Sequence, residues 1–165
     1  MTGADDLTTD VQIPIKSFYA RKRSGNPSYL HVVVPGANYA ADIASRPNGD
    51  LILEMGYEVD GEVAFLEQIS IVDIDQINVY DGGVNRSITI AGHRTISYTN
   101  NLITIDRQKA VYRALASNIL TFRFSHIDPY LNPGDTLVVG AEAMTVYNVI
   151  YIVDALRATM EVSEA

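Results

Sequence analysis

Residues 51–70 read LILEMGYEVDGEVAFLEQIS and place two runs rich in apolar residues on either side of Asp60-Gly61. Successive side chains of a strand point to opposite faces, so the first run places Leu51, Leu53, Met55 and Tyr57 on one face. The second run is Glu62–Ser70. Asp-Gly supplies the positive φ angles that a tight hairpin turn requires. The stretch therefore predicts a β-hairpin.

Two further breaker motifs extend this pattern along the chain. Asn48-Gly49 separates a predicted strand at Tyr39–Ser45 from Leu51–Tyr57, and Asp81-Gly82-Gly83 separates Ile74–Tyr80 from Asn85–Ala91. Val and Ile total 33 residues against 11 Leu, which favours strands because β-branched residues fit a pleated surface. The sequence predicts an all-β fold of one or two small antiparallel modules, barrel-like or sandwich-like, built from hairpins.

The expected organisation has three parts. Residues 1–10 form a mobile N-terminal tail, residues 11–105 a first β module, and residues 106–165 a second β module that packs on the first. Between Phe65 and Tyr80 the apolar residues change parity twice, which predicts a bulge or bend near 71–72 and another near 75–76. Asp106–Ala116 fits either a helix capped by Asp106 or a strand Ala110–Leu115 that returns as Ile119–Ile127.

Composition and motifs exclude several classes of function. The chain has no Cys, and its formal net charge is −8, which argues against nucleic-acid binding. No apolar run approaches the roughly 20 residues of a membrane helix. Asp73, Asp75 and Asp81 fit a solvated face better than a metal site, and His126 with Asp128 makes no catalytic relay. We expect no catalytic, metal or cofactor residues and no cofactor.

Charged and aromatic residues suggest surfaces rather than active sites. The basic cluster Lys16, Arg21, Lys22 and Arg23 fits a solvated hairpin end. Met144–Val153, predicted as one strand, has apolar residues at both its even-numbered and its odd-numbered positions, so both faces of the strand are apolar. Either a second layer of the chain or a neighbouring subunit must therefore cover one of these faces. The candidate subunit interface is Tyr147, Val149 and Tyr151, since tyrosine rings bury large areas while their hydroxyls stay hydrogen-bonded.

Several short motifs resemble the β-domains of bacteriophage tail and baseplate hub proteins. They are YLHVVVPG (29–36), RPNGDL (46–51), SITIAG (87–92), DPYLNPGDT (128–136) and MEVSE (160–164). In that family a Pro-Gly-Asp-Thr loop opens a hairpin and a Met-Glu-Val-like strand closes the domain. The resemblance implies a structural protein of the virion, assembled in the host cytoplasm. It also implies a homo-oligomeric ring, contacts with other tail proteins and no catalytic residues. It favours the strand alternative at 106–116.

Two other classes of function compete with this hypothesis. A β-sandwich binding module, for a carbohydrate or a protein ligand, would use exposed aromatic platforms, for which the chain has ten Tyr but no Trp. A small hydrolase would need a cluster of polar catalytic residues in a pocket, and no motif in the sequence indicates such a cluster. The tail component that the chain would form, whether hub, tail tip, distal tail ring or neck, stays open.

Overall fold

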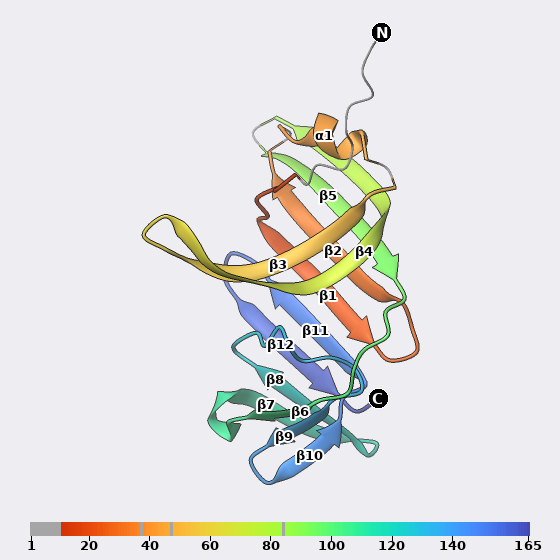
Figure 1. Cartoon of the computed structure of the whole chain (residues 1–165), viewed down its shortest axis with the longest axis vertical. Coiled ribbons are helices and arrows are strands. Elements are labelled where there is room, and N and C mark those ends of the chain that lie inside the picture. Colours follow the sequence, from red (N-terminus) through yellow and green to blue (C-terminus); the bar gives the residue numbers. More distant parts are fainter. Residues whose placement is uncertain (1–10, 37, 47, 84) are drawn as a thin grey trace.

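A computed structural model describes residues 11–36, 38–46, 48–83 and 85–165, with the side chains of 57, 58, 64, 65 and 85 left aside. The tail predicted for residues 1–10 lies outside the described residues. Within the described part the chain is nearly all β, as predicted (Figure 1). The strands are β1 Ser17–Arg23, β2 Ser28–Pro35, β3 Asp50–Val59, β4 Glu62–Gly82, β5 Asn85–Arg94, β6 Leu102–Ile105, β7 Ala110–Ala116, β8 Ile119–Phe124, β9 Thr136–Val139, β10 Glu142–Thr145, β11 Asn148–Val153 and β12 Ala158–Ser163.

The main sheet has nine strands in the order β3-β4-β5-β2-β1-β11-β12-β8-β7, with antiparallel neighbours throughout. β1 pairs with β11, from Phe18 opposite Val153 to Arg23 opposite Asn148. Strands from residues 11–105 and from residues 106–165 therefore share one sheet. The two expected modules are joined by backbone hydrogen bonds and do not merely pack on each other.

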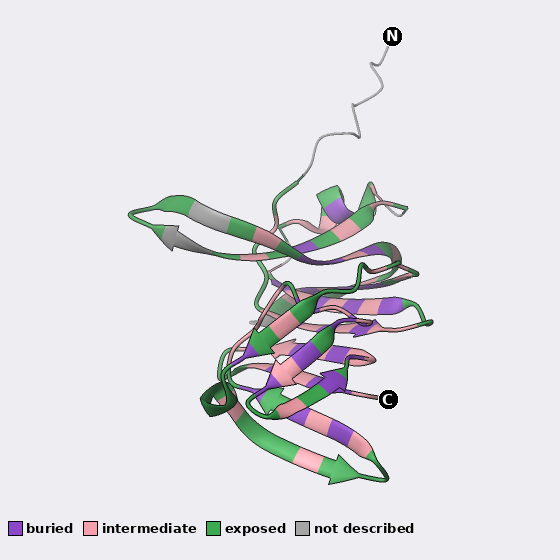
Figure 2. Ribbon diagram, turned by 60° about the horizontal axis from the view of Figure 1, so that its bottom comes forward, coloured by how far each residue is buried: buried purple, intermediate pink, exposed green. Residues whose placement is uncertain are grey.

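A second layer covers one face of this sheet. It contains the three-stranded sheet β10-β9-β6, in which β6 and β9 are parallel. β3 and the first half of β4 also pass in front of β2 and β1 (Figure 1). Alternate residues of the main strands point into the space between the layers, giving the banded colouring of Figure 2. The largest fully buried side chains include Leu30, Ile88, Phe122, Phe124, Leu137, Tyr151 and Met160.

The structure confirms the main hairpin predictions. Asp60 and Gly61 join β3 to β4 with φ angles of 54° and 83°. The segment after Asp106 is a strand and not a long helix. One 3-10 turn, Arg107–Lys109, precedes β7, and the carboxylate of Asp106 accepts a hydrogen bond from the Gln108 backbone N–H. Ser117 and Asn118 then turn the chain into β8 with positive φ angles of 50° and 62°.

Three local predictions were wrong. Residues predicted as a strand at Tyr39–Ser45 contain the short helix α1, Ala40–Ala44, because its alanines favour a helical turn and Ile43 reaches the core. Met144–Val153 is not one strand. It breaks at Val146 and Tyr147, so that β10 joins the small sheet and β11 the large one. The basic cluster expected at a solvated hairpin end lies instead largely within β1, which includes Arg21, Lys22 and Arg23.

β4 contains the bends that its changing parity predicts. Its pairing with β5 shifts register between Ile74 and Gln76, which leaves Asp75 as the extra residue of a bulge. The earlier shift lies at Ile69, between Ser70 and Gln68, two residues before the predicted position. On the neighbouring strand, a Cβ at Gly92 would overlap the backbone carbonyl oxygen of Asp73. Only a glycine lets β4 bend this close to β5.

We expect Gly92→Ala to lower the free energy of unfolding by about 3 kcal/mol, because the added methyl group forces backbone apart in a packed region. Gly61→Ala is the control. Its φ is +83° but no atom lies within 4 Å of the added Cβ, so it should cost only about 1 kcal/mol of backbone strain. Urea unfolding of both variants measures the difference, and equal costs would contradict the role of the close approach.

Candidate binding cleft

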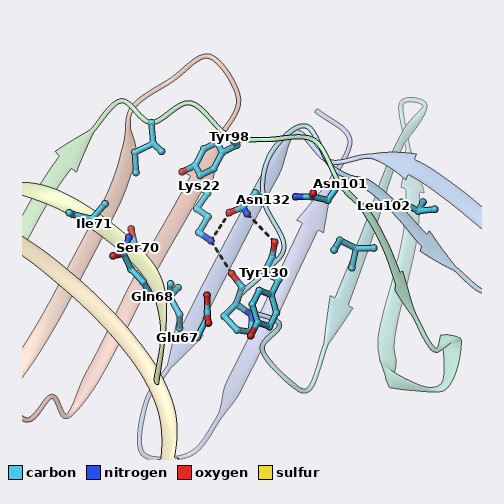
Figure 3. A pocket seen from close by; sticks show the side chains of 14 residues that line it. Lys22, Glu67, Gln68, Ser70, Ile71, Tyr98, Asn101, Leu102, Tyr130 and Asn132 are labelled. Atoms are coloured by element: carbon cyan, nitrogen blue, oxygen red, sulfur yellow. Dashed lines mark hydrogen bonds between the residues drawn. The ribbon is translucent and has the colours of Figure 1, made fainter. Parts of the chain in front are cut away.

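A cleft of about 660 Å³ opens between the second layer and the main sheet (Figure 3). One wall is the bent part of β4, residues 67–71. The opposite wall consists of the segment after β5, with Tyr98 and residues 101–103, and of the loop with Pro129, Tyr130 and Asn132. Lys22 of β1 lies between these walls. Segments far apart in the sequence therefore meet at one concave surface.

Lys22 fastens the loop to the main sheet. Its ammonium donates to the Asn132 Oδ1 at 2.9 Å and to the carbonyl oxygens of Pro129 and Leu131, each at 3.4 Å. The side chain is only 3% exposed, and its Nζ lies 5.3 Å from the centre of the Tyr151 ring. With three N–H groups and three acceptors, the amine acts as a structural tether and not as an exposed nucleophile.

Burial lowers the pKa of Lys22 to about 8, because removal from water disfavours the charged ammonium. Asp135, Asp128 and Glu67 oppose this shift through their negative charges. The surroundings of the amine thus hold three carboxylates. Sequence reasoning placed Lys22 in a solvated basic cluster, and that interpretation was wrong. Phe18, Ala20 and Lys22 alternate on the same inward face of β1, and this period of two was the missed signal.

Asp135 shapes the loop from the other side. It is fully buried, and its two carboxylate oxygens accept 2.7 Å hydrogen bonds from the backbone N–H groups of Asn101 and Asn132. The preceding Gly134 has a φ of +94°, and a Cβ there would overlap the side-chain oxygen of Asn100. The Pro-Gly-Asp motif therefore joins both segments of one cleft wall.

The predicted interface residues divide between the core and the surface. Val149 and Tyr151 are fully buried within the single chain, so a second layer of the same chain covers them. The Tyr151 hydroxyl bonds to the carbonyl oxygens of Leu131, at 3.0 Å, and Asp128, at 3.1 Å, and burial raises the pKa of this phenol. Tyr147 is half-buried and stacks under the Arg23 guanidinium at 5.1 Å. Of the three, Tyr147 alone reaches the surface.

The other acidic candidates form ion pairs on the surface. Asp73 pairs with Arg94, which lowers the pKa of its carboxyl, and Asp75 contacts the His93 Nδ1 at 2.5 Å. Within the described residues no group of three or more His, Asp or Glu side chains is arranged to hold a metal ion. No helix in the described part is long and apolar enough to cross a membrane. The His126 ring lies edge-on to the Phe124 ring, with 5.6 Å between the ring centroids, and burial lowers the pKa of its imidazole.

In comparisons with known proteins, no protein-family model and no curated protein matches the chain.

The free energy of unfolding should rise by about 1 to 2 kcal/mol between roughly pH 8 and pH 9.5. In this window an unfolded lysine, with a pKa of 10.5, keeps its proton while native Lys22 loses it. The unfolded state then binds more protons, so stability increases with pH. Lys22→Met should remove this slope whatever its absolute stability. Urea titrations across the window measure both, and a wild-type curve as flat as the variant's would contradict the lowered pKa.

Tyr151→Phe should lower the unfolding free energy by about 1 to 2 kcal/mol, because the Asp128 carbonyl oxygen, which is partly buried, and the buried Leu131 carbonyl oxygen lose their shared donor. Tyr147→Phe is the matched control, and its half-buried position predicts a change within about 0.5 kcal/mol. Thermal or urea unfolding measures both variants. Equal effects would show that the Tyr151 hydroxyl does not hold the loop.

Proposed function

We propose that the chain is a structural subunit of a bacteriophage tail, which assembles into a homo-oligomeric ring and contacts other tail proteins. The sequence resemblance to tail and baseplate hub β-domains supports this proposal. The observation that carries it is the β3–β4 hairpin, whose closed end extends beyond the body of the molecule in both views (Figures 1 and 2).

The projecting end of the hairpin is apolar at several exposed positions. Val63 is 63% exposed, Val59 52% and Leu66 46%. These residues lie on both strands of the arm, with Val59 opposite Glu62 and Leu66 opposite Gly56. Clustered exposed aliphatic groups are typical of protein interaction sites, because a soluble monomer gains nothing from leaving them in water.

The sheet also ends in two strands that lack a partner on one side in the described chain, β3 and β7. β7 reads AVYRALA, and its Val111, Tyr112 and Leu115 are exposed. It has no Lys or Pro, two of the residues with which edge strands commonly block pairing, its Arg113 is paired with Glu142 of β10, and its bulge lies at the start of the strand, at Val111. Contacts between two different surfaces of identical subunits are head-to-tail, and such contacts close into rings when the rotation allows.

The double variant Val63→Asp with Leu66→Asp should stay folded and lose assembly, because both side chains already face water in the single chain. Leu156→Asp, at a position 96% exposed in the β11–β12 turn, is the control for adding charge at an exposed leucine. Size-exclusion chromatography with light scattering gives the mass of each assembly, and negative-stain electron microscopy shows its shape.

We expect rings for the wild type and for Leu156→Asp and folded, smaller species for the arm variant. A wild-type chain that stays monomeric at every concentration would contradict self-assembly. Rings that survive the arm variant unchanged would exclude the arm as the contact.

A further inference from the structure

The cleft beside Lys22 has the dimensions of a small-molecule site. Its volume of about 660 Å³ falls within the range of about 300–1,000 Å³ found for such sites. The lining combines aliphatic side chains, such as Ile71 and Leu102, with amide, hydroxyl and carboxylate groups. The main sheet, the bent β4 and the Asp135-bonded loop all contribute, so the cavity is built from hydrogen-bonded elements (Figure 3).

One wall contains a polar group that lacks a partner. Ser70 of β4 is 3% exposed, and its buried Oγ has no hydrogen bond within the described structure. A buried hydroxyl without a partner is unfavourable, and most native hydroxyls avoid this state. Ser70 borders the cleft, so rotation of its hydroxyl about χ1 toward the cavity would let a hydrogen-bonding ligand seated against β4 supply the missing partner. The neighbouring amide of Gln68 also lines this wall.

The charges of the cleft disfavour an anion. Its one ammonium, on Lys22, already donates to three protein acceptors. The carboxylate of Glu67 borders the cavity, and the buried carboxylate of Asp135 lies behind the Lys22 amine. An acidic ligand would meet these negative groups with no free cation to bind. A neutral ligand with several hydroxyl groups meets acceptors and amides without that penalty.

Two tyrosines border the cleft on the wall opposite β4. Tyr130 is 52% exposed, and its hydroxyl faces Glu67. Partial loss of water and the negative charge of Glu67 raise the pKa of this phenol, which at neutral pH is a hydrogen-bond donor with or without that shift. Tyr98 is half-buried and held by a 2.7 Å hydrogen bond between its hydroxyl and that of Ser28. Aromatic rings beside polar groups suit amphipathic ligands, which have both an apolar and a polar side.

We propose that this cleft binds a neutral saccharide, with its hydroxyl groups on Ser70, Gln68 and Glu67 and its C–H face on the Tyr130 ring. The site lies on the body of the molecule, while the proposed assembly contact is the end of the arm. Binding is therefore expected whether or not the chain forms rings. The same chemistry would accept a free sugar or the end of a glycan chain.

Titration of the full chain with maltose, cellobiose and the corresponding methyl glucosides tests the site, with heteronuclear NMR shifts and calorimetry as readouts. At least one neutral sugar should bind saturably and shift the backbone signals of residues 67–71 and 129–132. Tighter binding of a disaccharide than of its methyl glycoside supports a glycan chain. Equal binding supports recognition of a single sugar unit.

Ser70→Ala should weaken this binding about fivefold while leaving the free protein at least as stable, since the lost hydroxyl has no partner there. Tyr130→Ala should weaken it about tenfold. Tyr80→Ala, which removes a 62% exposed ring outside the cleft lining, should leave it unchanged.

Three results would overturn the proposal. The first is that no neutral sugar binds saturably up to its solubility. The second is that glucuronic acid binds more strongly than the neutral glucosides. The third is that sugar binding is unchanged in both Ser70→Ala and Tyr130→Ala. The ring assay above is independent of each, so failure of the site and failure of the assembly proposal are distinguishable.

Discussion

The backbone of β4 passes so close to Gly92 that no side chain fits between the two strands. This contact, together with the bulge at Asp75, lets one 21-residue strand bend away from β5 and carry the β3 edge of the main sheet across the face of that sheet. The second half of β4 pairs with β5, and the first half carries β3 over the core. Without the bend, Leu53, Ile69 and Val72 could not join the core cluster.

The other side of the core depends on polar groups. Lys22 reaches from the main sheet to three oxygen atoms of the 129–132 loop, and Asp135 joins that loop to Asn101. Tyr151 adds its hydroxyl to the same loop. A buried ammonium is costly, and here its hydrogen bonds and nearby carboxylates offset only part of the lost hydration, which leaves its pKa lowered. A loop without regular secondary structure thereby becomes a fixed wall.

These two constraints explain why one strand contributes to both proposed functions. Residues 62–66 of β4 belong to the projecting arm, residues 67–71 line the cleft, and residues from Asp73 onward pair with β5. The arm exposes aliphatic side chains suited to another protein surface. The cleft presents amides, hydroxyls and an aromatic ring suited to a small polar ligand. The bend separates these surfaces along a single strand.

The sequence by itself determined the strand-rich class, the hairpins at Asp60-Gly61 and Asp81-Gly82-Gly83 and the need for β4 to bend, because turn chemistry and the period of two act over a few residues. For residues 106–116 it left a helix and a strand open. It did not determine the pairing of β1 with β11 or the break at Val146. Those depend on contacts between residues far apart in the chain. The same limit holds for the site. The carbonyl oxygens that surround the Lys22 amine come from a loop more than 100 residues away in the chain. The Ser70 hydroxyl lacks a partner only because β4 is buried in the folded chain.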